Sequence, residues 1–139
     1  MSGYSGTSLP RKLGIKEGHL VGLRSAPPDF EATLGELPDG VSLRGRVQGR
    51  NDVIVAFFDR RAELERRFEA LKRALDPDGG LWIAWPKRAS GVKTDVTEDD
   101  VRNLALAKGL VDNKVCAIDE TWSGLRLVYR VADRPALRR

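Results

Sequence analysis

The chain has few of the residues that most often carry catalytic chemistry, since its 139 residues include one cysteine and one histidine. A lone cysteine cannot form an intramolecular disulfide. Cys116 lies in the apolar run 115–118, so we expect a buried thiol and a reducing, cytoplasmic compartment. His19 has no cluster of cysteines or carboxylates around it and stands at the start of a predicted strand. We therefore predict no metal site and no Ser/His/Asp triad, and we name no catalytic residue.

Long apolar runs and long charge runs are also missing. No apolar run approaches the ~20 residues that cross a membrane, and the N-terminus lacks the apolar segment of a signal peptide. The net charge of +4 is spread over interleaved basic and acidic residues. Nucleic-acid binding usually needs clustered basic charge. We therefore expect neither a membrane nor a nucleic acid as partner.

Two continuous apolar runs, at 52–58 and 81–85, are the strongest structural signal. Such runs are typical of strands buried on both faces, in the centre of a parallel sheet. Weaker signals predict strands at 19–24, 41–47, 114–119 and 125–131 and helices at 30–35, 60–75 and 97–109. Asp59 is the predicted cap of the middle helix, a turn at 77–80 its end, and Thr97 with Asp100 resembles a capping box.

The order of these elements predicts an α/β domain with a three-layer, mostly parallel sheet and a C-terminal antiparallel strand. Alternation in the last strand sets Arg126 and Arg130 on a partly wet face. The length and the hydrophobic fraction of 41% suit one core. We assign a single domain to 10–132, a flexible segment to 1–9 and a polar tail to 133–139.

Too few residues separate the strand at 41–47 from the strand at 52–58 for another strand and its helices. Either the chain crosses back in an extended segment, or the strand at 41–47 pairs in another way. Gly22, in the middle of the first strand, marks a place where another group approaches closely.

The stretch 13–23, Leu-Gly-Ile-Lys-Glu-Gly-His-Leu-Val-Gly-Leu, resembles the entry to the first strand of class I S-adenosylmethionine-dependent methyltransferases. The resemblance implies a Rossmann-like, minimal methyltransferase-like fold. Over 3–131 the chain more closely resembles a family of small uncharacterised actinobacterial proteins, a domain of unknown function. The shared segments are 3–7, 78–87 and 112–126. That family implies no known activity.

The residues at the methyltransferase cofactor positions do not fit S-adenosylmethionine. The loop 25–29, Ser-Ala-Pro-Pro-Asp, has no glycine for close backbone approach, and its prolines remove two N–H donors. Asp29 would repel an anionic ligand at the following helix. The segment 41–45 offers no acidic residue for ribose hydroxyls, and no G-x-G-x-x-G is present for a dinucleotide. We therefore predict no cofactor.

The carboxyl ends of parallel strands meet at one edge of a sheet, where ligands bind in open α/β folds. That edge should gather segments distant in sequence, with tryptophans, basic heads, carboxylates and hydroxyls. The predicted ligand-binding residues are Ser25, Asp29, Asp59, Trp85, Lys87, Arg88, Ser90, Asp119, Glu120, Trp122 and Ser123. The structural alternative is that Trp85 is core, Trp122 caps the last hairpin and Lys87 pairs with Asp119 or Glu120.

Three functions from different classes fit the sequence. The favoured one is a non-enzymatic binding or regulatory module on a degenerate methyltransferase-like scaffold, with an unknown small molecule or protein as partner. The second is an enzyme at the same sheet edge, either a divergent methyltransferase or one of other chemistry. The third is a nucleic-acid or protein partner bound through the basic loop 87–93.

Overall fold

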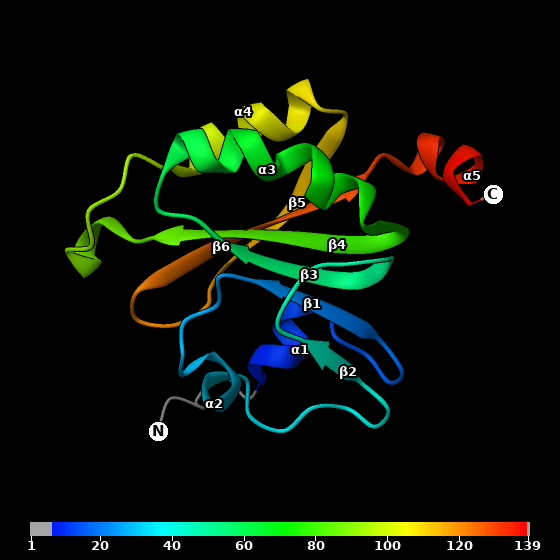
Figure 1. Cartoon of the computed structure of the whole chain (residues 1–139), viewed down its shortest axis with the longest axis horizontal. Helices are drawn as coiled ribbons and strands as arrows, with labels where there is room; N and C mark the ends of the chain where they lie inside the picture. The colour runs from blue at the N-terminus through cyan, green and yellow to red at the C-terminus, as the bar shows by residue number, and fades with distance from the viewer. Residues whose placement is uncertain (1–6, 139) are drawn as a thin grey trace.

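The computed structural model describes residues 7–138, which form a six-stranded sheet with helices on both faces (Figure 1). The predicted flexible segment 1–9 lies mostly outside the described residues. The α-helices are α1 (Leu9–Leu13), α2 (Phe30–Leu34), α3 (Arg61–Arg73), α4 (Glu98–Ala107) and α5 (Arg134–Leu137). The strands are β1 (Leu20–Arg24), β2 (Ser42–Arg44), β3 (Asn51–Phe57), β4 (Leu75–Pro86), β5 (Leu110–Ala117) and β6 (Trp122–Tyr129). Short 3-10 turns, η2 (Arg88–Ser90) and η3 (Val131–Asp133), follow β4 and β6.

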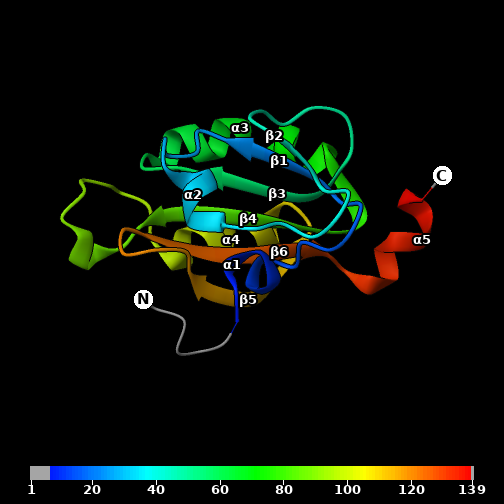
Figure 2. The same ribbon diagram turned by 90° about the horizontal axis from the view of Figure 1, so that it is seen from below.

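The strand order in the sheet is β2-β1-β3-β4-β6-β5. β1 pairs in parallel with β2 and β3, and β3 pairs in parallel with β4, whereas β6 is antiparallel to both of its neighbours. Helices α3 and α4 cover one face of the sheet, and α1 and α2 cover the other (Figures 1 and 2). The predicted three-layer, mostly parallel α/β fold with an antiparallel C-terminal strand is confirmed.

The two apolar runs form the central strands β3 and β4, as predicted, and their side chains are buried on both faces. The predicted turn at 77–80 is wrong, because β4 already begins at Leu75 and runs through it. The register of β4 against β3 shifts between Asn51 and Val53. A Cβ on Gly79 would lie 2.4 Å from the Asp52 carbonyl oxygen, so glycine lets the two strands approach there.

The strand β2 lies at the edge of the sheet, and the chain returns from it to β3 without another strand or helix. Of the two alternatives, the extended crossing is the one found. The return ends at Asn51, which is fully buried and donates from its side-chain amide to the carbonyls of Gln48 and Ala74. Asn51 also explains Gly22, because a Cβ on that glycine would lie 2.9 Å from Asn51 Oδ1.

The C-terminal strands begin earlier than predicted, β5 at Leu110 and β6 at Trp122. Arg130 is exposed as expected, but Arg126 is half-buried and its Nε has no hydrogen-bond partner among the described residues. Part of the predicted polar tail forms α5, beside which Arg138 pairs with Asp78 on β4. Among residues 7–138, no helix has the length and apolarity to cross a membrane.

Candidate ligand site at the carboxyl edge of the sheet

The strand order reverses between β1 and β3. From β1 the chain goes to β2 on one side, and it returns to β3 on the other side. In open α/β sheets this reversal opens a crevice outside the carboxyl ends of the two strands, and ligands bind in it. The residues that end β1 and β3 therefore decide what this edge can hold.

Arg24, the last residue of β1, reaches across that crevice. Its Nη1 donates to the Phe57 carbonyl at the end of β3 (3.0 Å), and its Nη2 donates to Glu63 Oε2 on α3 (2.8 Å). The guanidinium carbon lies 4.3 Å from the centre of the Phe58 ring. Burial lowers the pKa of Arg24, and the Glu63 carboxylate opposes that shift. The side chain of Arg24 therefore bridges the ends of β1 and β3 and the start of α3.

Aromatic side chains fill the space on the other side of Phe57. Its ring meets Phe30 of α2 edge-on, with centroids 5.2 Å apart, and meets Trp122 of β6 in the same way at 5.0 Å. Trp85 is 7% exposed and belongs to the core on the α3 and α4 face. The predicted aromatic wall is thus mostly packed within the protein.

The loop after β1 turns sharply at Ser25, whose φ is +55°. Ser25 is the one non-glycine residue in 7–138 with a positive φ, in a region that L-residues seldom occupy. Ser25 and Arg24 line a small cavity of about 280 Å³ with Arg46 and Arg67. Asp29 is exposed at the start of α2 and makes no side-chain capping bond.

The long polar loop 87–97 extends beyond the sheet at the end of β4 (Figure 1) and is fixed to the end of β3. Thr94 Oγ1 donates to the carbonyl of Asp59 (2.7 Å). Asp95 Oδ1 accepts from the backbone N–H of Arg61 (2.7 Å), so Asp95 caps α3 from the loop. The prediction of Asp59 as this cap is wrong, because Arg60 holds the N-cap position and Asp59 makes no capping bond.

Two cavities flank this loop. One, of about 470 Å³, is lined by Trp85, Arg88, Lys93 and Glu98 among others. The other, of about 550 Å³, is lined by residues that include Asp59, Lys93 and Asp95. Lys93 and Thr94 line both cavities, and we call the two cavities together the loop groove.

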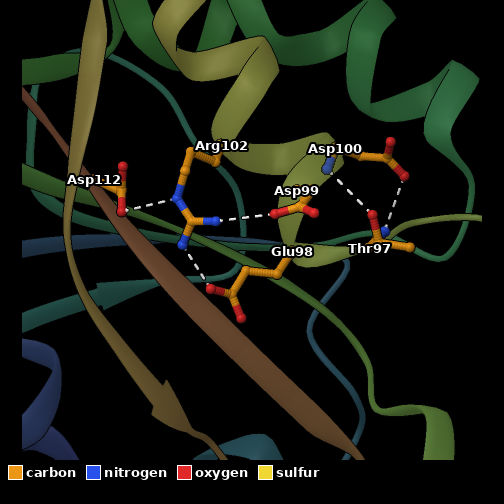
Figure 3. A network of polar contacts seen from close by, with 6 residues as sticks. All are labelled: Thr97, Glu98, Asp99, Asp100, Arg102 and Asp112. Carbon is orange, nitrogen blue, oxygen red and sulfur yellow. Dashed lines mark hydrogen bonds and ion pairs between the residues drawn. The ribbon is translucent and has the colours of Figure 1, made fainter.

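The carboxylates at the start of α4 are already engaged (Figure 3). Thr97 and Asp100 form the predicted capping box, each side chain accepting from the other's backbone N–H. Arg102 donates to Glu98, Asp99 and Asp112, and the bond to Glu98 is the leading cause that raises the pKa of Arg102. This network fastens α4 to β5 and gives the end of the loop groove a fixed wall.

The hairpin between β5 and β6 engages further predicted residues. Asp119 Oδ1 accepts from the N–H groups of Thr121 and Trp122, at 2.8 Å each, and so closes the turn. The Lys87 N–H donates to the Thr121 carbonyl (2.7 Å), and Ser90 Oγ donates to the Lys87 carbonyl (2.6 Å). No ion pair of Lys87 with Asp119 or Glu120 is found within 7–138.

The predicted site residues therefore fall into separate groups. Asp59, Trp85 and Arg88 line the loop groove, and Ser25 lines the small cavity beside Arg24. Ser123 pairs in the sheet with Trp85 and Ala117, and Glu120 is exposed in the hairpin turn. The sequence reasoning missed Arg24, Thr94 and Asp95, whereas Lys93 belongs to the basic loop 87–93 of the third predicted function. The described residues contain no cluster of three or more side chains that could hold a metal.

Several solved structures with a similar fold are methyltransferases. A SAM-dependent methyltransferase from Aquifex aeolicus matches with a TM-score of 0.61 and 17% identity, over 84% of this chain and 85% of that one. A putative type 11 methyltransferase from Sulfolobus solfataricus matches with a TM-score of 0.60 and 16% identity, over 88% of this chain and 90% of that one. The DhpI–SAH complex matches with a TM-score of 0.60 and 12% identity, over 94% and 86% of the two chains.

This chain has a methyltransferase-like fold. Identities this low establish the fold and leave the activity open. No family model matches the chain, and no curated protein does. The resemblance to the actinobacterial family therefore stays a prediction. The resemblance implies a glycine-rich loop after β1 and an acidic residue at the end of β2, and at these positions the chain has the loop 25–29, without glycine, and Arg44.

Proposed function

We propose that the chain is a non-enzymatic binding module on the methyltransferase-like fold. One observation carries the proposal: the Arg24 guanidinium bridges the crevice, bonded to the Phe57 carbonyl and to Glu63 and stacked on Phe58. A ligand in that crevice would have to displace these contacts. The proline-containing loop 25–29 and Arg44 at the end of β2 support the same conclusion.

The loop groove is the better place for a partner at this edge. Arg88 and Lys93 line it together with Asp59, Asp95 and Glu98, and Val92 beside them is 43% exposed. A groove with charges of both signs and an exposed apolar group suits a polar small molecule, or a protein segment, that itself carries positive and negative groups. The carboxylates of this groove disfavour a nucleic-acid backbone, because they would repel its phosphates.

A divergent S-adenosylmethionine-dependent methyltransferase is the second candidate. Two of the similar solved structures are methyltransferases by their descriptions, and they align with most of this chain, so the comparisons support this candidate better than the binding module. It requires Arg24 to leave the crevice. The ion pair between Arg24 and Glu63 is partly accessible, because their side chains are 24% and 29% exposed. A strongly bound cofactor could therefore displace the Arg24 side chain.

Isothermal titration with S-adenosylmethionine separates the two candidates. The binding module predicts no saturable heat with the wild-type chain. Low-micromolar binding would put the methyltransferase first. The variant R88A serves as a control in the loop groove, because it leaves Arg24 and its contacts intact and should not change the result with S-adenosylmethionine.

A further inference from the structure

The sheet has a second hollow at the opposite, amino edge, away from the site proposed above. This cavity measures about 510 Å³ and lies between the end of α1, the starts of β3 and β4, and the strands β5 and β6. Basic side chains from three parts of the chain line it: Arg11, Lys12, Lys16, Lys114 and Arg126. A volume of this size is typical of a small-molecule site.

Arg126 carries a buried donor that no described residue satisfies. It is half-buried, and its Nε is fully buried with no hydrogen-bond partner among the described residues. Burial is the leading cause that lowers the pKa of Arg126, with the charge of Arg134 second. An arginine stays charged in proteins, and a buried donor without a partner is costly. Among residues 7–138 no carboxylate forms an ion pair with Arg126, so its charge has no counter-charge bound to it beside the cavity.

Gly80 on β4 makes the room that Arg126 occupies. A Cβ on Gly80 would lie 2.4 Å from Arg126 Nε and 2.8 Å from its Cζ and Nη2. No residue other than glycine fits at position 80 while the guanidinium of Arg126 is in place. The guanidinium thus lies against the backbone of β4 and lines the cavity at the same time.

The remaining charges of the cavity point to an anionic ligand. Lys114 stands directly opposite Arg126 in the β5–β6 pairing, and its Nζ donates to the Lys12 carbonyl at the end of α1. The three carboxylates that line the cavity already accept hydrogen bonds from within the chain. Asp52 accepts from the Leu20 N–H (2.8 Å), Asp76 from the Asp78 N–H (2.9 Å), and Asp78 from the Arg138 guanidinium.

We propose that this amino-edge cavity binds the phosphate group of a small molecule, with Arg126 and Lys114 as its principal donors. A guanidinium and neighbouring ammonium groups are the donors that phosphate oxygens prefer. Asp52, Asp76 and Asp78 also line the cavity and would repel the further charges of an extended polyanion, so the ligand is compact. The site is independent of the loop groove and of the function proposed for it.

The test is titration of the full chain with inorganic phosphate and with glycerol 3-phosphate, followed by isothermal calorimetry at constant ionic strength. Both anions should bind the wild type. Tighter binding of the ester identifies a phosphorylated small molecule, and equal binding identifies free phosphate. The variants R126Q and K114Q should each weaken binding by about tenfold or more, the loss of one charge-assisted contact. The control R73Q makes the same charge change at an exposed residue of α3 that lines neither this cavity nor the loop groove, and it should bind like the wild type.

K114Q and two new variants, R126K and G80A, keep the test decisive if R126Q does not fold. R126K retains the charge, and K114Q changes an exposed side chain. G80A should displace the guanidinium and weaken phosphate binding without removing any charge. The proposal is overturned if the wild type binds neither anion, if R73Q weakens binding as much as K114Q, or if an oligonucleotide binds at this edge and the two small anions do not.

Discussion

The indole of Trp82 donates its Nε1–H to the carbonyl oxygen of Leu13, at 2.9 Å, and both residues are fully buried. Trp82 lies in the middle of β4, and Leu13 is the last residue of α1. The bond satisfies a carbonyl at the end of the helix that has no partner within the helix. It fastens the first helix of the described chain to a central strand.

Replacing Trp82 by Phe should lower the free energy of unfolding by about 1–3 kcal/mol, because the Leu13 carbonyl is left buried without a donor. Urea unfolding followed by circular dichroism measures the change. W85F is the matched control, since no hydrogen bond from the Trp85 indole is found in 7–138. Equal losses in the two variants would show that the ring volume matters and the hydrogen bond does not.

Asp95, and not Asp59, should stabilise the start of α3. D95A removes the acceptor for the Arg61 N–H and should cost about 1 kcal/mol, the usual value for a helix cap. D59A should leave the free energy of unfolding nearly unchanged, because its side chain makes no capping bond. Chemical denaturation of the two variants decides, and a larger loss in D59A would contradict the capping geometry.

The protonation of Glu63 should make the free energy of unfolding depend on pH in the acidic range. The hydrogen bond from Arg67, and then the charges of Arg66 and Arg24, lower the pKa of Glu63. The pKa of Glu63 is therefore lower in the folded chain than in the unfolded chain, where it is about 4.3. The contacts of Glu63 stabilise the fold fully above the unfolded pKa. This stabilisation is lost as the pH falls through the folded pKa.

The difference in free energy of unfolding between the wild type and E63Q should therefore be constant above about pH 5 and shrink below about pH 4. Urea midpoints across this range give that difference. E65Q is the control, because Glu65 is 58% exposed and lies 3.9 Å from Arg61. A difference for E63Q that does not change with pH would contradict the assigned contacts.

Cys116 should react slowly with thiol reagents. Burial raises the pKa of the Cys116 thiol, and the charges of Lys114 and Lys12 oppose that shift only in part. Less thiolate is then present at a given pH than in a free cysteine, whose pKa is about 8.5. The pH profile of the reaction with Ellman's reagent should have its midpoint above that value in the folded chain and near it in denaturant. A folded-state midpoint below the free value would contradict the burial.

The sequence contains the information for the centre of the fold because burial on two faces leaves an unmistakable pattern. The continuous apolar runs that became β3 and β4 could therefore be predicted, and so could the antiparallel β6. The early start of β4 could not, because it depends on contact between Gly79 and the Asp52 carbonyl across strands. Glycine next to proline and aspartate reads locally as a turn.

The candidate site was less accessible to sequence reasoning. The topology allowed the carboxyl edge and its segments to be predicted, but which side chains are free depends on contacts distant in sequence. Arg24 spans 33 positions to the Phe57 carbonyl, and Asp95 spans 34 to the Arg61 N–H. A polar side chain in a loop shows its chemistry in the sequence and does not show which backbone group it meets.

The direct test of the central claim is a titration of the wild-type chain with SAH, followed through backbone amide chemical shifts. The account predicts no saturable shifts at Ser25, Phe58 and Glu63, because Arg24 holds the crevice between β1 and β3 closed. The variant R24A removes that closure without touching the rest of the edge, and any weak binding should appear there first. Saturable shifts at these three residues in the wild type, with a dissociation constant in the low-micromolar range, would contradict the account.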